Sequence, residues 1–304
     1  MTGMQVLAID AGQTGMKVRV EGADVVFRGI DTHEPLLPQL AEVVHGAIAR
    51  TGSTPDIVTA GISGLTDRDA DAGLLLSLVR DTGVRAASLA HDSTTSFLGA
   101  LGDARGAVVA AGTGVVTLAV GVDAVSRVDG WGYIMGDAGS GYWIGREALD
   151  AVMRAYDGRG RQTALTDPVR ALWPDLSRAY IDLQAAEDRV RIVASFAAEV
   201  ARLSVEGDAV AQAISDRAAR ELAHSVLTSL ANVQRGDDEH FTVCAIGGVF
   251  RSQRLHDAFA AELTRDRQDV TLVAPRGEGI DGALALADLS PEHPLSSAVH
   301  RAVA

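Results

Sequence analysis

Residues 129–149 form the most distinctive stretch of the chain and read Asp-Gly-Trp-Gly-Tyr-Ile-Met-Gly-Asp-Ala-Gly-Ser-Gly-Tyr-Trp-Ile-Gly-Arg-Glu-Ala-Leu. Glycine occupies six of these positions, and two of the chain's three Trp and two of its four Tyr lie among them. Glycine lets the backbone turn tightly and approach another group closely, and aromatic rings add rigid apolar surface. Asp137 stands between Gly136 and Ala138, so little shields its carboxylate. The stretch predicts either a pocket wall for a polar small molecule or a glycine-rich hairpin that packs its own tryptophans.

The composition limits the class of protein. The 304 residues suit two domains, and a hydrophobic content of 47% supports buried cores. The formal charge of -13 argues against nucleic acid or an anionic membrane as the main partner, but not against phosphate bound by backbone N–H groups. The one cysteine, Cys244, excludes an internal disulfide. Because we find neither a signal peptide nor an apolar run of about 20 residues, we expect a cytoplasmic location.

The N-terminal part opens on three short strands, which apolar or alternating runs predict over 4–9, 16–20 and 24–30. The first turn contains Asp10, two glycines and Thr14. Tight glycine turns expose backbone N–H groups that hold phosphate oxygens, and an aspartate at a strand end can order a hydrated Mg²⁺. The same residues also suit an ordinary hairpin turn.

Helices and strands then alternate, which favours an α/β layer with a mixed sheet. Strands are predicted over 56–60 and 86–90, and helices over 36–50 and 93–101. Asp92 lies where a strand ends and a helix begins, the usual place for site residues in open α/β sheets. Its carboxylate could accept a proton from a substrate hydroxyl, or it could only cap the helix, which the spacing alone favours.

The pattern of strand, glycine turn and strand returns after residue 105. Strands are predicted over 106–111, 115–120 and 124–128, and the turn at 111–114 echoes the first one. Two copies of this phosphate-binding pattern arise by chance less often than one copy. We therefore infer that a nucleotide binds between two domains. A linker-like segment at 102–106 gives an N-terminal domain over 1–105 and a C-terminal domain over 106–304 with a helical insertion.

The rest of the chain is predicted to be mostly helical. A buried strand over 241–246 ends at Gly247 and Gly248, and such a pair lets a flat group approach the backbone. A helix of small residues that packs closely is expected over 280–289, and the tail from Ser290 is expected to be peripheral.

Together these elements resemble the BadF/BadG/BcrA/BcrD ATPase family and, within it, the N-acetylglucosamine kinase-like sugar kinases of the actin, hexokinase and Hsp70 superfamily. The resemblance covers nearly the whole chain and is most specific at 130–145. Weaker matches are those to the first phosphate motif at 10–14, the second at 111–114 and the adenosine motif at 246–249. The resemblance implies an α/β fold of two ribonuclease-H-like (actin-like ATPase) domains with a cleft between them.

The resemblance also implies ATP and Mg²⁺ as cofactors and a small-molecule sugar as substrate. Asp10 would order Mg²⁺, and Asp92 would be the general base at the sugar hydroxyl. Phosphoryl transfer depends on in-line positioning and charge neutralisation more than on covalent chemistry. The other implied residues are Gly12, Gln13 and Thr14 at the β- and γ-phosphates, Thr113, Gly114, Gly247 and Gly248 at the nucleotide, and Thr32, Gly130, Trp131 and Asp137 at the sugar.

Departures from the family pattern concern the acceptor. Val115 and Val116 stand where the sugar kinases usually have Ser and Asn, and the asparagine expected near Thr32 is missing, so Asp31 or Thr32 would replace it. Unpaired buried groups would weaken recognition of an N-acetyl sugar. We expect a kinase for a sugar, above all an amino sugar such as N-acetylglucosamine or glucosamine, while another hexose stays open.

Two other functions are possible on the same fold. An ATPase of the dehydratase-activator type holds an iron–sulfur cluster between two subunits, which needs about four thiolates, whereas the expected homodimer has only Cys244 from each chain. A sugar-sensing ATPase without acceptor phosphorylation is the second alternative, and the retention of Asp10, Thr14 and Asp92 argues against it.

Overall fold

The computed structural model describes residues 4–31, 34–236, 239–265 and 267–304. Their contacts divide the chain into two compact units. The first unit comprises the residues up to Val108, Val120–Val125 and Ala274–Ala304, and the second comprises Val109–Ala119 and Ser126–Val273. No helix in the described ranges is long and apolar enough to cross a membrane.

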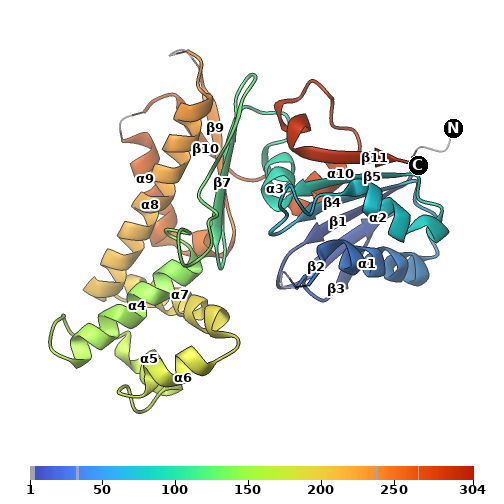
Figure 1. The fold of residues 1–304 in the computed structure, drawn as a ribbon. Coiled ribbons are helices and arrows are strands. Elements are labelled where there is room, and N and C mark those ends of the chain that lie inside the picture. Colours follow the sequence, from blue (N-terminus) through green and yellow to red (C-terminus); the bar gives the residue numbers. More distant parts are fainter. Residues whose placement is uncertain (1–3, 32–33, 237–238, 266) are drawn as a thin grey trace. The chain divides into compact units, whose positions relative to one another are not determined.

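The first unit is built on a six-stranded sheet with the order β11-β5-β4-β1-β2-β3 (Figure 1). β1 runs parallel to β4 and antiparallel to β2, and β4 runs parallel to β5. All residues of β4 are buried, as expected for a strand inside a covered sheet. The strands are β1 (Val6–Ala11), β2 (Met16–Val20), β3 (Ala23–Phe27), β4 (Ile57–Ile62), β5 (Ala86–His91) and β11 (Val299–Val303).

Helices cover both faces of this sheet (Figure 1). Leu7 and Ile9 of β1 share a core with the residues of α1 and α2, whereas Ala8 packs with Ile280 and Ala283 of α10. Because side chains alternate along a strand, Asp10 lies on the same face as Ala8. The helices are α1 (Leu36–Thr51), α2 (Ala72–Leu78), η1 (Arg80–Thr82), α3 (Asp92–Leu101), α10 (Gly279–Ala285) and η3 (Pro294–Ala298).

The second unit contains a five-stranded sheet with the order β10-β9-β6-β7-β8. When the strands are matched by their order along the chain, this sheet has the same arrangement as β5-β4-β1-β2-β3 of the first sheet. The agreement is consistent with the strand–turn–strand pattern that occurs twice in the sequence. The predicted α/β fold class is therefore confirmed. The strands are β6 (Gly106–Ala111), β7 (Val115–Val120), β8 (Val125–Val128), β9 (Phe241–Ile246) and β10 (Val270–Val273).

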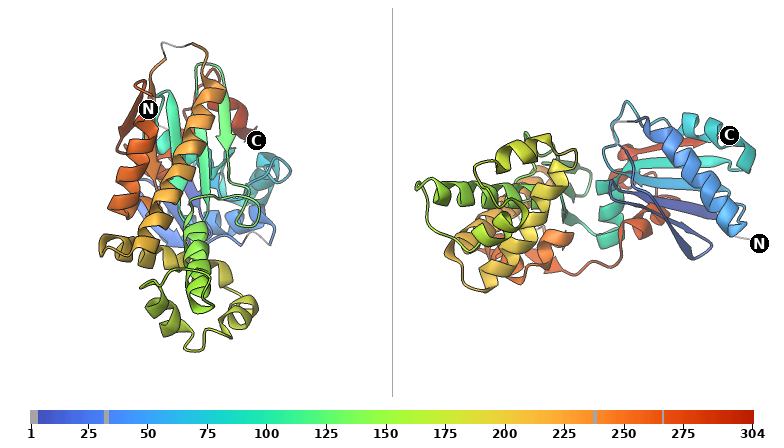
Figure 2. Two further views of the ribbon diagram at one scale, coloured as in Figure 1. Left: turned by 90° about the vertical axis from the view of Figure 1, so that its left-hand side faces the viewer. Right: turned by 90° about the horizontal axis from the view of Figure 1, so that it is seen from below.

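The helices of the second unit fall into two groups. α8 and α9 pack together along the sheet, and α4 packs against α7, with α5 and α6 beside them (Figure 2). The helices are α4 (Gly141–Tyr156), α5 (Thr166–Leu172), α6 (Ala179–Ala185), α7 (Arg189–Val205), α8 (Ala209–Val233), η2 (Gly248–Arg251) and α9 (Gln253–Thr264).

The structure decides one open alternative and overturns one expectation. Of the two alternatives for 129–149, the hairpin is wrong, because Ser140 caps a helix that begins at Gly141, its Oγ accepting from the Trp143 N–H at 3.1 Å. The tail is not peripheral, because β11 pairs antiparallel with β5. Together with α10 it belongs to the first unit, although the sequence analysis assigned all of 106–304 to one domain.

Candidate active site

Asp10 stands at the end of β1 on the sheet face covered by α10. Lys17 lies opposite it on β2. The backbone of Gly279 packs against the carboxylate so closely that a Cβ there would lie 2.7 Å from Oδ2. Burial, Asp92 and Glu278 together raise the pKa of Asp10 to about 6, although Lys17 lowers it. This carboxylate is therefore in a site with an excess of negative charge that would favour a cation.

Lys17 and Glu278 complete this cluster, and neither was predicted from the sequence. The Lys17 ammonium donates to Glu278 Oε2 at 2.8 Å and lies 3.2 Å from Asp24 Oδ2. The hydrogen bond to Glu278 is the main cause that raises the pKa of Lys17. Glu278 comes close to Asp10 only because the chain returns to the first unit just before α10. No local pattern in the sequence therefore indicates that Glu278 belongs to this cluster.

A backbone contact between α3 and α10 fixes the position of Glu278. A Cβ at Gly282 would lie 1.7 Å from the Thr95 carbonyl, and one at Gly99 would lie 2.0 Å from the Glu278 carbonyl. Only glycine permits this approach. The prediction of a closely packed helix of small residues is thus confirmed, and α10 begins at Gly279.

Asp92 is the first residue of α3, where β5 ends. Its Oδ1 is buried without a hydrogen-bond partner, although the side chain as a whole is 30% exposed. Oδ1 lies 2.9 Å from His91 Nδ1, which also accepts from the Ser93 N–H at 3.1 Å. Apart from this ring nitrogen, Oδ1 has no polar partner among the described residues. The capping group of the helix is His91 instead.

Asp92 is the ionised partner of the two carboxylates. Burial raises the pKa of Asp92, but His91, the Ser63 hydroxyl and the Ser93 amide outweigh it and hold the pKa below its usual value. The pKa of Asp10 moves the other way. Two nearby carboxyl groups whose pKa values are pushed apart are a common sign of a functional site.

The turn after β1 has the conformation of a short glycine loop. The Gly12 N–H donates to the Gly15 carbonyl at 3.1 Å, and a Cβ at Gly29 would lie 2.0 Å from the Gln13 carbonyl. The side chains of Gln13 and Thr14 are exposed. Contact of Gly12, Gln13 and Thr14 with phosphate stays a prediction. Thr32 lies outside the described residues.

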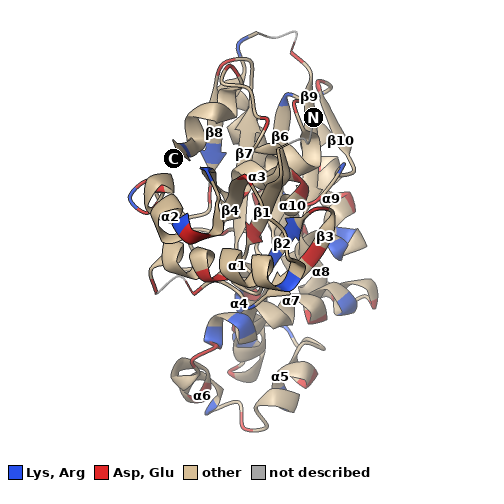
Figure 3. Cartoon of the chain, turned by 90° about the vertical axis from the view of Figure 1, so that its right-hand side faces the viewer, with Lys and Arg blue, Asp and Glu red and all other residues tan. Residues whose placement is uncertain are grey.

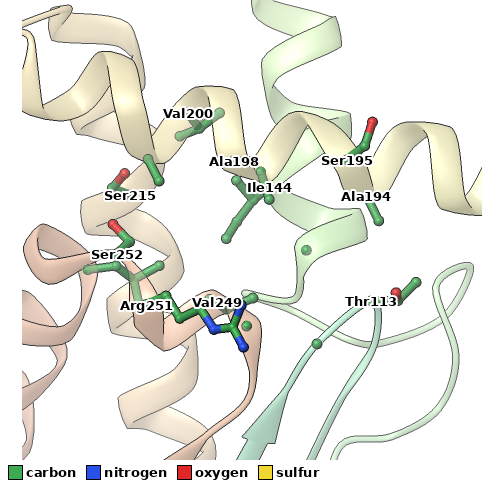
Figure 4. Close-up of a pocket in the computed structure, with 16 residues that line it drawn as sticks. Thr113, Ile144, Ala194, Ser195, Ala198, Val200, Ser215, Val249, Arg251 and Ser252 are labelled. Carbon is green, nitrogen blue, oxygen red and sulfur yellow. The ribbon is translucent and has the colours of Figure 1, made fainter. Parts of the chain in front are cut away.

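The second unit contains a pocket of about 480 Å³ (Figure 4). Thr113 lies at one end of it and α7 forms one wall, while Arg251 extends from η2 on the opposite side (Figure 4). The Ser252 hydroxyl, another lining group, is buried without a hydrogen-bond partner. The apolar lining comes mainly from Ile144, Ala194, Ala197, Ala198, Val249 and Leu255.

The glycine pair after β9 has two different structural roles. Gly247 has φ 102, and a Cβ there would lie 2.3 Å from the Ala111 carbonyl, so this position requires glycine. Gly248 lines the pocket and has no atom within 4 Å of where its Cβ would be. The predicted nucleotide residues Thr113, Gly247 and Gly248 therefore meet at one pocket or directly beside it. Gly114 does not line it.

Asp129, which the sequence analysis did not single out, organises the loop that leads to α4. Its carboxylate accepts from the N–H groups of Gly130 at 2.8 Å, Asp137 at 2.7 Å and Ala138 at 3.0 Å. Asp129 and Asp137 both have positive φ, which is unfavourable for residues other than glycine. These three hydrogen bonds compensate for that strain.

Asp137 is buried against Gly114, where a Cβ would lie 2.7 Å from its Oδ2. Burial and the negative charge of Asp129 raise the pKa of Asp137. Gly130 packs on Val116, while the Trp131 side chain is 63% exposed, with the Arg127 guanidinium 5.6 Å from its ring. The structure thus brings Asp137 to the second glycine turn. Contact of Gly130, Trp131 and Asp137 with a sugar stays a prediction.

The described residues contain no group of three or more His, Cys, Asp or Glu side chains arranged to hold a metal ion. This does not disagree with Mg²⁺, which keeps several water ligands and is often bound through one or two carboxylates. Asp10, next to Glu278 and Asp92, has the hard oxygen donors that this ion prefers.

Comparison with known proteins gives the family. A model of the BadF/BadG/BcrA/BcrD ATPase family matches residues 7–287. The chain belongs to this family. The family match includes Asp10, Asp92, Asp137 and the glycine pair at 247 and 248.

Relatives of this BadF/BadG/BcrA/BcrD family member include named sugar kinases. The N-acetylmuramic acid/N-acetylglucosamine kinase of Clostridium acetobutylicum is 25% identical over 308 residues, which cover 93% of this chain and 97% of that protein. The N-acetyl-D-glucosamine kinase of Dictyostelium discoideum is 36% identical over 113 residues, which cover 36% of this chain and 35% of that protein. The crystal structure of a candidate N-acetylglucosamine kinase from Chromobacterium violaceum shares 25% identity and a TM-score of 0.67, covering 93% of this chain and 98% of that one.

Cys244 does not have the properties of a cluster ligand in this family member. It lies in β9 and is fully buried. Burial raises the pKa of the Cys244 thiol to about 11, so it stays protonated at neutral pH. An iron–sulfur cluster between subunits needs exposed thiolates.

Proposed function

We propose that this protein is an ATP-dependent kinase that transfers the γ-phosphoryl group to a hydroxyl of a sugar. The similarity to the Clostridium acetobutylicum kinase, which extends over 93% of this chain, is the observation that carries the proposal. The arrangement of Asp10 and Asp92 supports it, because both carboxylates stand where strands of one sheet end. We further propose an amino sugar, such as N-acetylglucosamine or glucosamine, as the acceptor.

Asp92 is the proposed general base. Its buried Oδ1 has no polar partner among the described residues besides His91 Nδ1, and a sugar hydroxyl would supply a donor. The depressed pKa of Asp92 keeps it ionised at neutral pH, ready to take the hydroxyl proton as the new P–O bond forms. The same hydrogen bond orients the nucleophile for in-line attack, which is the larger requirement in phosphoryl transfer.

Asp10 is the proposed ligand of Mg²⁺, directly or through water. When bound, this ion neutralises charge on the β- and γ-phosphates. A cation beside Asp10 would also lower its raised pKa and keep the carboxylate ionised. The turn formed by Gly12, Gln13 and Thr14 is the proposed cradle for the same phosphates, through backbone N–H groups and the Thr14 hydroxyl.

The pocket of the second unit is the proposed nucleotide site. Its apolar lining suits the flat face of adenosine, and the unpaired Ser252 hydroxyl is available for a hydrogen bond with the base. Thr113 and Arg251 supply polar groups toward the phosphates. Gly248 leaves room for the nucleoside because no Cβ projects from it.

Asp137 is the proposed partner for sugar hydroxyls, with Gly130 and Trp131 beside it. Val116 packs against Gly130 and makes that part of the loop apolar. We also propose that the protein acts in the cytoplasm, where ATP is available. The expected homodimer stays a prediction that analytical ultracentrifugation will check.

An ATP-consumption assay over a panel of acceptors tests this function. The panel contains N-acetylglucosamine, glucosamine, N-acetylmuramic acid, glucose and no sugar, each with and without Mg²⁺. We expect ATP consumption that depends on both one amino sugar and Mg²⁺, with a phosphorylated sugar detected by mass spectrometry. ATP hydrolysis that is equal in the absence of any sugar would contradict a kinase and favour the sugar-sensing ATPase.

A further inference from the structure

A second hollow in the second unit is lined by arginines. It measures about 520 Å³ and lies over α4, the start of α8 and the loop after α4. None of its residues lines the proposed nucleotide pocket. We call it the arginine groove. Its charged lining residues are Arg146, Glu147, Asp150, Arg154, Arg161 and Arg217.

The charges of the arginine groove do not cancel. Glu147 is shared by two arginines, accepting from Arg217 at 2.7 Å and lying 3.3 Å from Arg146. Asp150 pairs with Arg154 at 2.6 Å. Arg161 has no ion pair or hydrogen bond with any part of the chain that the structure describes. Four guanidinium groups against two carboxylates leave an excess of two positive charges, in a protein whose net charge is -13.

Three of the four arginines are held in place without being buried. Glu147 is only 16% exposed and fixes Arg217, whose guanidinium also lies 5.1 Å from the ring of Trp143. The side chains of Arg146, Arg154 and Arg217 remain 64%, 49% and 50% exposed. They are therefore preorganised by carboxylates and an aromatic ring, yet accessible to a ligand. Figure 3 shows the basic residues of α4 in blue.

We propose that the arginine groove binds a phosphate monoester of a small molecule. A monoester carries close to two negative charges at neutral pH, which matches the excess in the groove. The planar guanidinium fork binds phosphate oxygens in pairs. The remaining lining is apolar and suits a compact organic part; it consists of Ala151, Ala209, Val210, Ala213 and Ile214. A polyanion would be opposed by the negative charge of the whole protein.

The position of the groove connects it to the nucleotide pocket through one helix. α4 carries Arg146 and Arg154, and at its first residues the Gly141 and Tyr142 N–H groups donate to the carbonyls of Gly112 and Thr113 at 2.8 and 3.0 Å. A ligand in the arginine groove would therefore lie on the same rigid element that supports the second glycine turn. Binding itself does not depend on the proposed kinase activity.

Isothermal titration calorimetry with glucose 6-phosphate tests the proposal. Inorganic phosphate and glucose serve as companion probes, and all titrations contain saturating AMP-PNP to fill the nucleotide pocket. We expect glucose 6-phosphate and phosphate to bind and glucose not to bind, with affinity falling as salt rises. The Arg161→Gln and Arg217→Gln variants should each bind glucose 6-phosphate about tenfold more weakly, as is typical when a charge-assisted hydrogen bond is lost.

Arg202→Gln is the matched control. Arg202 is as exposed as Arg217, at 50%, and is likewise paired with glutamates, but it lies on α7 outside the groove. Its binding should equal that of the unaltered protein, and circular dichroism will show that every variant is folded. Unchanged affinity in a double Arg161→Gln, Arg217→Gln variant would overturn the proposal, as would the absence of binding at millimolar phosphate ester. Neither result would bear on the sugar-kinase proposal, which is tested by ATP consumption.

Discussion

The carboxylate of Asp10 rests against the backbone of Gly279, although 268 intervening residues separate them in the chain. A Cβ at 279 would lie 2.7 Å from Oδ2 and 3.0 Å from both Cγ and Oδ1. Gly279 opens α10, which the α3 contact holds in place. The position of the proposed Mg²⁺ ligand is therefore set by an element from the far end of the sequence.

The Gly279→Ala variant should displace the Asp10 carboxylate while leaving the fold intact. Because misplacement of a reacting group by about 1 Å can lower turnover about 10²-fold, we expect a loss of that order in kcat. Steady-state kinetics at saturating Mg²⁺ will measure it. Gly236→Ala is the control, since nothing lies within 4 Å of a Cβ there. Equal kcat in both variants would refute the role of this contact.

Asp10 should make the protein less stable as the pH rises. Its pKa is raised to about 6 in the folded state, so the folded protein binds more protons than the unfolded chain between about pH 4 and 6. The resulting destabilisation is absent below about pH 4 and complete above about pH 6. A shift of this size corresponds to about 2 to 3 kcal/mol.

Urea unfolding of Asp10→Asn, without Mg²⁺, checks this dependence. The variant should have a higher free energy of unfolding than the unaltered protein at pH 8 and the same value at pH 3.5. At the same time it should lose kinase activity, because the amide is a poorer ligand for Mg²⁺. A variant that is less stable at pH 8 would show that Asp10 is not held in a site of excess negative charge.

Asp129 should act on the sugar through the shape of its loop. Asp129→Ala removes the acceptor of three N–H groups and leaves Asp137 without support for its positive φ. We expect an increase of about tenfold or more in KM for the sugar, with a smaller change in KM for ATP. The Asp129→Asn variant keeps one acceptor oxygen, so its KM for the sugar should lie between the values of the unaltered protein and of Asp129→Ala. The reverse order of the Ala and Asn variants would be inconsistent with this role.

Gly247 and Gly248 provide a matched pair. Gly247→Ala places a Cβ 2.3 Å from the Ala111 carbonyl at φ 102, so we expect a loss of at least about 2 kcal/mol in stability. Gly248→Ala has free space and should fold normally, but its methyl group projects into the pocket region and should weaken AMP-PNP binding. Thermal unfolding and calorimetry separate the two effects. Similar melting temperatures for both variants would contradict the different structural roles given to Gly247 and Gly248.

The sequence predicted the elements that local patterns encode. Alternating and apolar runs placed β1, β2, β6 and β7 to within a few residues, and the two glycine turns predicted that the strand–turn–strand pattern occurs twice. Asp10 and Asp92 were predicted as site residues because each follows a predicted strand. These features depend on residues that are close in the chain.

Long-range contacts could not be predicted in this way. Glu278 and Gly279 meet Asp10 only because the chain returns to the first sheet after residue 273, and nothing near Asp10 encodes this return. The start of α4 is hard to predict from local sequence because glycines at 141 and 145 have low helix propensity. In the structure a Cβ at Gly145 would lie 1.8 Å from the Val193 carbonyl, so packing against α7 explains the glycine. Tertiary contact outweighed propensity there.

Turnover of the Asp92→Asn variant tests the central claim most directly. The amide keeps the size of the side chain but cannot accept the hydroxyl proton as a carboxylate does. We predict that kcat for phosphorylation of the amino sugar falls by at least about 10², while the Kd of AMP-PNP measured by calorimetry is unchanged. Near-normal turnover in Asp92→Asn would contradict the assignment of Asp92 as the base and, with it, the proposed mechanism.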